Sequence, residues 1–324
     1  MLNNVFIKFL DQPHAYVLYA FLTFLVTAVL LKIDFKFLPR DQGRIYALNG
    51  ELSKGKTRGV GLIMMISFVL FSFLFIPFSV EFLLYAAFII FEMISGYLDD
   101  ASSSPWSEYK KGLIDLAVSV IISVIFVFNN STDIYFGKYL ISIHPVLYVI
   151  LATVLIWMSI NAVNCTDGVD GLSSSVGVVS MLSVLMIFSS SLPSSLPTSY
   201  FGYTLLFISV LLAYLLFNVS PSQILMGDAG SRALGVFLAI LAIKSRHPIS
   251  YLLFCAVFII DGLTGLVKVF LLRFLKIGIL KNIRTPLHDE MRKNHHWSDP
   301  QVVLRFSLVQ IVFSTLLFII LSIH

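Results

Sequence analysis

Long apolar runs, separated by short polar stretches, dominate the chain. The runs begin near ten positions: Ala15, Gly59, Phe82, Leu113, Pro145, Leu172, Phe201, Ser231, Ile249 and Phe306. The run from Ser231 is short. A bilayer core requires about 20 apolar residues per helix, whereas the strands of a membrane barrel alternate in hydrophobicity, which these runs do not. The pattern predicts an all-α, polytopic membrane protein of about ten transmembrane helices, organised as a single integral-membrane domain over residues 1–324.

Composition agrees with this class. The chain has 324 residues, of which 58% are hydrophobic and 12% charged, whereas soluble domains are typically about 25% charged. Cys165 and Cys255 provide neither a disulfide framework nor the spacing of a metal site. Residues 1–30 lack a basic n-region and a clear cleavage site, so we expect the first helix to be retained. We expect membrane lipid around the chain and no nucleic acid as a partner.

Basic residues are distributed unevenly over the loops that ten helices would create. Most of the 22 lysines and arginines fall on one set of loops and its edges, at residues 32–58, 99–111, 161–170, 218–230 and 273–305. The opposite set carries Lys8, Lys138, Lys244 and Arg246. Because positive residues are retained on the cytoplasmic side, the first set is predicted to be cytoplasmic and both termini to lie outside.

Five aspartates fall on these cytoplasmic loops, next to glycines and helix ends. They lie in GYLDD (Asp99, Asp100), NAVNCTDGVDGLSSS (Asp167, Asp170) and MGDAGSRALG (Asp228). Glycine allows a ligand to approach the backbone closely, and helices starting at Leu172 and Ser231 would direct N–H groups at a phosphate. Carboxylates would repel phosphate unless a divalent cation lay between them, and oxygen ligands suit Mg²⁺ or Mn²⁺. The alternative is that the acids are ordinary solvated loop charges.

Few ionisable residues lie inside the predicted spans. A transporter would place such groups near the membrane midplane, in broken helices. Glu92 and Asp115 lie within about two turns of cytoplasmic ends, where they would support the acidic loops. Asp261, in DGLTG, lies within a run; it marks a broken helix or pairs with Lys268 along one helix face. The concentration of charge at the interface favours an enzyme that joins a water-soluble phosphate compound to a membrane-bound partner.

The three acidic motifs, in this order and on these loops, resemble those of the polyprenyl-phosphate N-acetylhexosamine-1-phosphate transferases. The segment TPLHDEMRKNHHWSDPQVVLRF is similar to the last cytoplasmic loop of the branch that transfers phospho-N-acetylmuramoyl-pentapeptide, through Pro286, Leu287, His288, Trp297, Val303, Arg305 and Phe306. That branch has three consecutive histidines where this chain has His288-Asp289-Glu290. The stretch SKGKTRGVG at 53–61 matches the family only loosely.

The resemblance implies transfer of phospho-N-acetylmuramoyl-pentapeptide from its UDP carrier to undecaprenyl phosphate, which yields lipid I and UMP for peptidoglycan synthesis. It implies UDP-N-acetylmuramoyl-pentapeptide and undecaprenyl phosphate as partners, Mg²⁺ as cofactor, and a multi-pass protein of the bacterial plasma membrane; a homodimer is compatible with it. The lipid cannot leave the membrane and the nucleotide cannot enter it. The site must therefore lie at the interface, where phosphoryl transfer requires positioning and charge neutralisation.

The resemblance also implies roles for individual residues. The catalytic group would be Asp99, Asp100, Asp228 and His288, with Asp228 as the metal ligand and Asp99 as the candidate base for the lipid phosphate. Residues implied in substrate binding are Asn164, Asp167, Asp170, Asn218, Leu225 and Lys54. Asp170 and Asn218 would contact uridine, and Leu225 stands where the branch usually has a phenylalanine that stacks on uracil. For His295 and His296 two interpretations stay open, solvated loop residues or residues with a functional role. Trp297 is likewise either an interfacial anchor or part of the site.

Two other functions stay open at this point. Sister enzymes of the family transfer N-acetylglucosamine-1-phosphate from UDP-N-acetylglucosamine, and their last loop is usually richer in histidine and lacks the Trp–Val–Arg-Phe ending. A transporter of anionic solutes is the alternative outside the family. Release of UMP from each UDP-sugar separates the two enzymes, and solute flux without UMP release would indicate transport.

Overall fold

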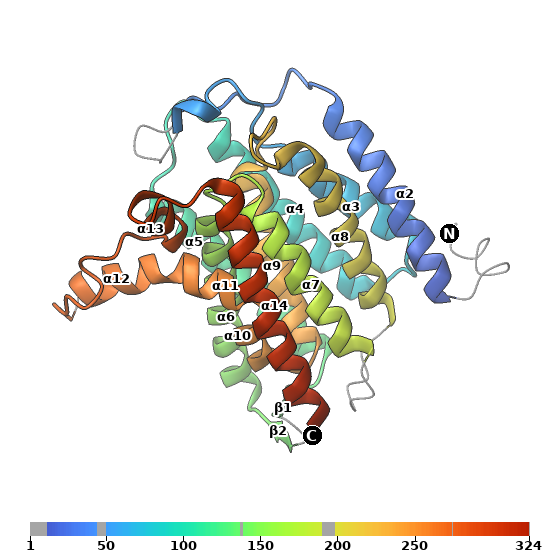
Figure 1. Cartoon of the computed structure of the whole chain (residues 1–324). Helices are drawn as coiled ribbons and strands as arrows, with labels where there is room; N and C mark the ends of the chain where they lie inside the picture. The colour runs from blue at the N-terminus through green and yellow to red at the C-terminus, as the bar shows by residue number, and fades with distance from the viewer. Residues whose placement is uncertain (1–11, 44–49, 137–138, 190–197, 274, 324) are drawn as a thin grey trace.

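The computed structural model describes residues 12–43, 50–136, 139–189, 198–273 and 275–323, and helices make up most of them (Figure 1). The long helices are α2 (Gln12–Lys32), α3 (Gly61–Phe75), α4 (Val80–Asp100), α5 (Glu108–Asn129), α6 (Pro145–Thr166), α7 (Leu172–Ser189), α8 (Thr198–Asn218), α9 (Gly227–Lys244) and α14 (Asp299–Ile323). The short elements are η1 (Gly50–Ser53), η2 (Pro248–Ser250), α10 (Tyr251–Phe254), α11 (Ala256–Phe258), η3 (Ile259–Leu263), α12 (Thr264–Arg273) and α13 (Leu287–Lys293). An antiparallel hairpin joins α5 to α6 through β1 (Asp133–Phe136) and β2 (Tyr139–Ser142).

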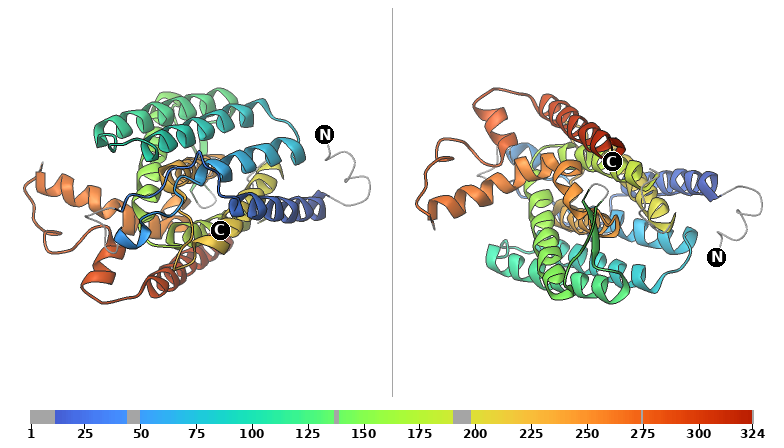
Figure 2. Two further views of the ribbon diagram at one scale, coloured as in Figure 1. Left: turned by 90° about the horizontal axis from the view of Figure 1, so that it is seen from above. Right: turned by 90° about the horizontal axis from the view of Figure 1, so that it is seen from below.

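The helices form one bundle with two different ends. In Figure 1 the segment after α2, η1 and α13 lie at the upper end, whereas the β-hairpin and the C-terminus lie at the lower end. Both views in Figure 2 show α12 projecting to one side of the bundle. The polar loops of the sequence therefore gather at the upper end, although they are distant along the chain.

Six described helices are long and apolar enough to cross a membrane. They are α2 from His14 onward, α4, α5, α6, α8 and α14. Helices α3 and α7 are apolar but shorter, α9 carries charged side chains, and the chain from Tyr251 to Arg273 is divided into short pieces. The predicted class, a helical polytopic membrane protein, is confirmed, while the number of ten spans and the side of the termini stay predictions.

Helix α9 is the centre of the bundle, since every one of its residues is buried. Its first half contains glycine, alanine and serine at most positions, which lets neighbouring backbones come close. A Cβ atom on Gly235 would lie 2.6 Å from the Cα atom of Ile160 in α6, and one on Gly61 in α3 would lie 2.1 Å from the backbone nitrogen of Gly230. The small residues of GDAGSRALG are thus required for packing.

One arginine of α9 forms ion pairs with two acidic side chains inside the bundle. The Nη2 atom of Arg232 lies 2.8 Å from Oε2 of Glu92 in α4 and is hydrogen-bonded to Asp115 in α5. All three side chains are buried, and removing one partner of such a cluster leaves an uncompensated buried charge. Glu92 and Asp115 thus join α4, α5 and α9 beneath the upper loops, which is the supporting position that the sequence predicted for them.

The chain is broken at Asp261. A π-helical turn, Ile259–Leu263, interrupts the run there, which confirms the predicted break. The alternative, a pair between Asp261 and Lys268, is wrong: the Nζ atom of Lys268 donates to the carbonyl of Ile283 at 2.7 Å. A same-face pair requires uninterrupted 3.6-residue turns, and a π turn shifts all later side chains around the axis.

The packing of α9 predicts that the same glycine-to-alanine substitution changes the free energy of unfolding differently at two positions. We expect Gly235→Ala to lower the free energy of unfolding by about 1–3 kcal/mol, because its methyl group would overlap the backbone of α6. Gly112→Ala in α5 is the control, since no atom lies within 4 Å of the added Cβ. That change should be neutral or stabilising by up to about 1 kcal/mol. Thermal unfolding in detergent measures both; equal effects would contradict the close approach of α6 and α9.

Candidate functional site

A cleft of about 570 Å³ opens at the upper end of the bundle. This volume lies in the range of small-molecule sites, which is about 300–1,000 Å³. Its walls come from the segment before α3, the first turn of α5, the α6–α7 and α8–α9 loops, α13 and the start of α14. The lining residues include Asp41, Lys56, Arg58, Lys111, Asn164, Cys165, Asp167, Asp170, Tyr214, Asn218, Leu225, Asp228, His288, Asp289 and Arg292.

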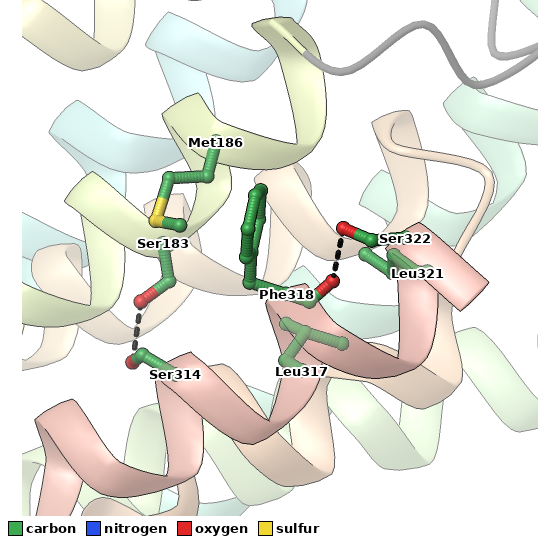
Figure 3. Close-up of a pocket in the computed structure, with 7 residues that line it drawn as sticks. All are labelled: Ser183, Met186, Ser314, Leu317, Phe318, Leu321 and Ser322. Carbon is green, nitrogen blue, oxygen red and sulfur yellow. Dashed lines mark hydrogen bonds between the residues drawn. The ribbon is translucent and has the colours of Figure 1, made fainter.

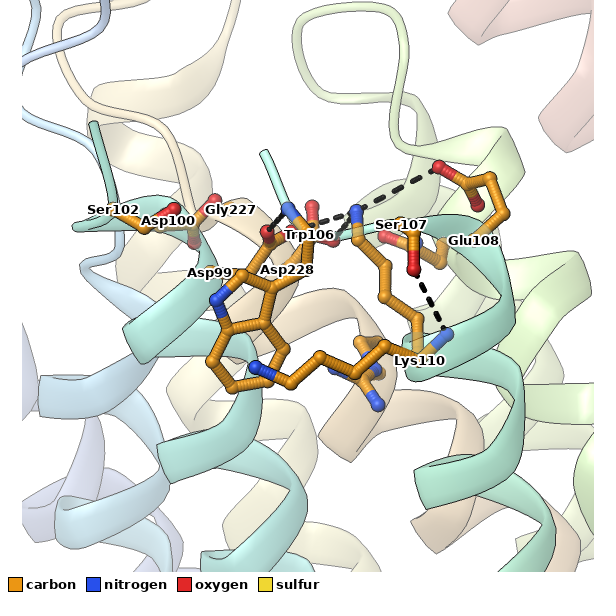
Figure 4. A network of polar contacts seen from close by, with 12 residues as sticks. Asp99, Asp100, Ser102, Trp106, Ser107, Glu108, Lys110, Gly227 and Asp228 are labelled. Carbon is orange, nitrogen blue, oxygen red and sulfur yellow. Dashed lines mark hydrogen bonds and ion pairs between the residues drawn. The ribbon is translucent and has the colours of Figure 1, made fainter. Parts of the chain in front are cut away.

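Two basic side chains join the acids of α4 and α9 at the floor of this cleft. The Nε atom of Arg58 lies 2.7 Å from Oδ1 of Asp100, and its Nη2 atom lies 3.4 Å from Oδ1 of Asp228. The Nζ atom of Lys111 lies 2.6 Å from Oδ2 of Asp99 and 3.2 Å from Oδ2 of Asp228. The three aspartates are thus brought together as the sequence predicted, within the polar network shown in Figure 4. Asp228 lines the cleft, whereas Asp99 and Asp100 are not among the lining residues and their side chains are buried behind it.

Glycines make this convergence of α4 and α9 possible. A Cβ on Gly96 would lie 2.4 Å from the carbonyl carbon of Asp228, and one on Gly227, which has a φ of 68°, would lie 2.1 Å from Oδ2 of Asp100. No other residue fits either place. The backbone N–H of Ala229 donates to Oδ2 of Asp100 at 3.3 Å, so this donor at the start of α9, predicted for phosphate, holds a carboxylate.

Asp99 is fixed by the loop between α4 and α5. Its Oδ1 atom accepts a hydrogen bond from the backbone N–H of Trp106 at 2.7 Å. The indole of Trp106 is covered in turn by Lys110, whose Nζ atom lies 3.1 Å from the ring centroid (Figure 4). Both carboxylate oxygens of Asp99 are therefore engaged, one by Lys111 and one by the backbone.

Arg58 is one of the cleft residues that sequence reasoning missed, together with Asp41, Lys56 and Lys111. Burial alone would lower the pKa of Arg58, but the carboxylates of Asp100 and Asp228 raise it above its usual value. Burial would also raise the pKa of Asp41, yet hydrogen bonds from Gly43, Arg58 and Ser53 lower it. Both groups are held in their charged forms. A signal was present in the alternation Lys56-Thr57-Arg58, because alternate side chains of an extended chain share one side.

The oxygen atoms of the carboxylates at the floor of the cleft are of the type that binds a divalent cation, but they do not form a complete set of metal ligands. Among the residues that the structure describes, no three His, Cys, Asp or Glu side chains are grouped so that they could hold a metal ion. Mg²⁺, however, is usually held by one or two carboxylates together with water and substrate phosphates. Asp228, with Asp100 and Asp99 behind it, could supply such carboxylates, which are paired here with Arg58 and Lys111.

The α6–α7 loop is held by its own polar side chains. Oδ1 of Asn164 accepts from Ser231 Oγ at 2.8 Å, which ties the end of α6 to α9. Oδ1 of Asp167 accepts from Ser173 Oγ at 2.5 Å, in the first turn of α7. Asn164 in the last turn of α6 and the loop residues Asp167 and Asp170 all line the cleft, as predicted.

The α8–α9 loop meets the α6–α7 loop through Asp170 and Asn218. Oδ2 of Asp170 accepts from the backbone N–H of Ser222 at 2.9 Å and lies 3.9 Å from Nζ of Lys56. Asn218 accepts from the N–H of Gly171 at 2.8 Å and donates to the carbonyl of Ile224 at 2.9 Å. Asn218 therefore positions two loops through the backbone, in addition to lining the cleft.

The predicted substrate residues Leu225 and Lys54 have different positions. Leu225 lines the cleft, and its N–H donates to the carbonyl of Thr57 at 2.9 Å. Lys54 is exposed and is not among the lining residues, whereas Lys56, two positions along, is. The turn at Gly55, with a φ of 84°, separates the directions of these two lysines.

His288 reaches the cleft from the start of α13. Its Nε2 atom approaches so closely that a Cβ on Gly168 would lie 2.4 Å from it. His295 and His296 are exposed, and Trp297 is half-buried with the Arg305 guanidinium 4.1 Å from its ring centroid. The solvated interpretation of His295 and His296 therefore fits their exposure.

A second hollow lies between α7 and α14, lined by Ser183, Met186, Ser314, Leu317, Phe318, Leu321 and Ser322 (Figure 3). Its volume is about 10 Å³, which is close to the minimum for a single water molecule. It is too small for a substrate.

Comparison with known proteins agrees with the motifs. Residues 82–246 match the model of glycosyl transferase family 4. A phospho-N-acetylmuramoyl-pentapeptide-transferase of Treponema pallidum is 38% identical over 304 residues, covering 89% of this chain and 84% of that protein. Another of that name, from Dictyoglomus thermophilum, is 28% identical and covers 90% of this chain and 94% of its own length. The chain belongs to glycosyl transferase family 4 and, within it, to the phospho-N-acetylmuramoyl-pentapeptide transferases.

Proposed function

We propose that the protein transfers phospho-N-acetylmuramoyl-pentapeptide from UDP to undecaprenyl phosphate, releasing UMP and forming lipid I. The observation that carries the proposal is the cluster of Asp228, Arg58 and Lys111 in a cleft of about 570 Å³. The relatives that cover most of the chain bear the name of this activity, which favours it over N-acetylglucosamine-1-phosphate transfer. The charged side chains that line the cleft lie at one end of the bundle, and the deeper charges of Arg232, Glu92 and Asp115 pair with one another, which argues against a transporter.

The positions of the charges suggest how the nucleotide would lie. Arg58 and Lys111 would bind pyrophosphate oxygens, since both are cationic and line the cleft. Asp170 and Leu225 lie on the wall made by the α6–α7 and α8–α9 loops, and Lys56 reaches Asp170 from the segment before α3. These three residues would contact the uridine. His288, which lies against Gly168 in the α6–α7 loop, would lie beside the sugar phosphate.

Activation of the lipid phosphate would involve the acids behind Asp228. Asp99 is the proposed base; Lys111 lies 2.6 Å from one of its oxygens and the backbone N–H of Trp106 donates to the other. Binding of a substrate phosphate to Lys111 would draw this lysine away from Asp99, coupling substrate binding to the availability of the base. Mg²⁺ or Mn²⁺, when bound to Asp228, would neutralise phosphate charge.

We further propose ten membrane spans with both termini outside and the cleft facing the cytoplasm. The uneven distribution of lysine and arginine supports this orientation. The gathering of the predicted cytoplasmic loops at one end of the bundle, with the β-hairpin at the other, is compatible with it (Figure 1). A cytoplasmic cleft would give a soluble UDP-sugar access from the compartment that holds nucleotides.

The function is tested by release of radiolabelled UMP from purified protein supplied with undecaprenyl phosphate. We expect release from UDP-N-acetylmuramoyl-pentapeptide and little from UDP-N-acetylglucosamine. The reverse preference would assign the protein to the sister activity. No release from either nucleotide, by protein that still binds UMP, would contradict the proposal.

Loss of the metal ligand should abolish most of the activity. We expect Asp228→Asn to lower kcat by at least about 100-fold, because a bound cation stabilises the transition state by several kcal/mol. Excess EDTA should do the same to the wild type, and added Mg²⁺ should restore it. The control is Glu51→Gln, an exposed change outside the cleft, which should keep full activity. Full turnover in EDTA would refute the metal assignment.

The orientation can be tested with matched cysteines. In a variant without Cys165 and Cys255, Ser103→Cys in the α4–α5 loop should resist a membrane-impermeant thiol reagent in intact cells. Ser131→Cys, next to the hairpin at the other end, should react. Both serines are exposed, so a difference reports the side of the membrane rather than burial. Labelling of Ser103→Cys from outside would reverse the proposed topology.

A further inference from the structure

Asp261 and His288 form a buried pair beside the cleft. Oδ1 of Asp261 accepts from the backbone N–H of His288, and Oδ2 lies against the ring Nδ1, both at 2.8 Å. Asp261 is 1% exposed and His288 is 3% exposed. A buried carboxylate must be hydrogen-bonded, and these two contacts engage both oxygens of Asp261.

The pair determines which ring nitrogen faces the cleft. A carboxylate can only accept hydrogen bonds, so Nδ1 carries the proton. In the neutral ring Nε2 then presents a lone pair. Nε2 is the atom that lies against Gly168, and Gly168 and His288 both line the cleft. The nearest carboxylate on that side belongs to Asp289, with Oδ1 3.9 Å from Nε2.

The local fold is built around this contact. The π-helical turn contains Asp261 in an otherwise apolar segment, and such turns often occur at functional sites. The adjacent Gly262 would place a Cβ 2.2 Å from the carbonyl oxygen of Ala162, so the turn lies directly against α6. Neither the turn nor the buried acid is required merely to continue a helix through the bundle.

We propose that Asp261 is a positioning residue that fixes the orientation and tautomer of His288, so that Nε2 acts as a hydrogen-bond acceptor toward the substrate. The proposal rests on the proposed function, because the group that Nε2 would bind belongs to the substrate of that cleft. A hydroxyl or a protonated phosphate oxygen near the sugar phosphate is the group that Nε2 would bind. Asp261 itself does not touch the substrate.

Asp261→Asn tests this role without changing the size of the side chain. The amide oxygen can still accept from the backbone N–H of His288, but the amide nitrogen would donate to Nδ1 and move the ring proton to Nε2. We expect kcat to fall about 10- to 100-fold, as when hydrogen-bond partners of metal-binding histidines are removed. UMP affinity and the melting temperature should stay close to wild type.

Two further variants separate positioning from simple destabilisation. In a His288→Ala background, Asp261→Asn should cause no additional loss of kcat, because a residue that acts through His288 has nothing left to position. Lys268→Met is the control on the same broken segment, since Lys268 binds the Ile283 carbonyl. It should leave kcat unchanged. Equal losses from Asp261→Asn with and without His288, or no loss at all, would overturn the proposal.

Nitrogen NMR of ¹⁵N-histidine-labelled protein provides a test that needs no turnover. The His288 signals, assigned by their absence from His288→Ala, should show a protonated Nδ1 in the wild type and a protonated Nε2 in Asp261→Asn. A wild-type ring protonated at Nε2 alone would overturn the inference even if the variant failed to fold. Absence of UMP release by the wild type, with the expected tautomer present, would instead refute only the proposed function.

Discussion

The contact between the first turn of α9 and the end of α4 is the constraint on which the site depends. Here two backbones touch without side chains between them, because Gly96 and Gly227 leave room for Asp228 and Asp100. The aspartates of distant motifs thereby come close enough to share Arg58. A β-carbon on Gly96 would overlap the backbone of Asp228, and one on Gly227 would overlap the carboxylate of Asp100.

Charge balance follows from this convergence. The carboxylates of Asp41, Asp100 and Asp228 surround Arg58, and those of Asp99 and Asp228 surround Lys111. Two cations between four acids leave negative charge, which suits a metal ion and opposes phosphate alone. Deeper in the bundle, Arg232 forms ion pairs with both Glu92 and Asp115. Both clusters lie against α9, so the helix that packs the bundle also organises its charges.

The two walls of the cleft are supported differently. The wall with Asp170 and Asn218 is tied together by hydrogen bonds between loop backbones and side chains. The wall with His288 depends on Asp261, which reaches it from a break in a helix. The α6–α7 loop joins the two, because Asp170 accepts from Ser222 on one side and Gly168 lies against His288 on the other.

The sequence by itself determined the helical class, the approximate position of each apolar run and the acids that meet, since these depend on local hydrophobicity and on motif spacing. It also indicated that a break at Asp261 was one option. Only the tertiary structure decided that Asp261 binds His288, that Arg58 and Lys56 line the cleft, and that exposed Lys54 does not. Those outcomes depend on the turn at Gly55, the π turn at Ile259–Leu263 and the glycine contacts of α9, where one change in backbone direction decides which side chains meet.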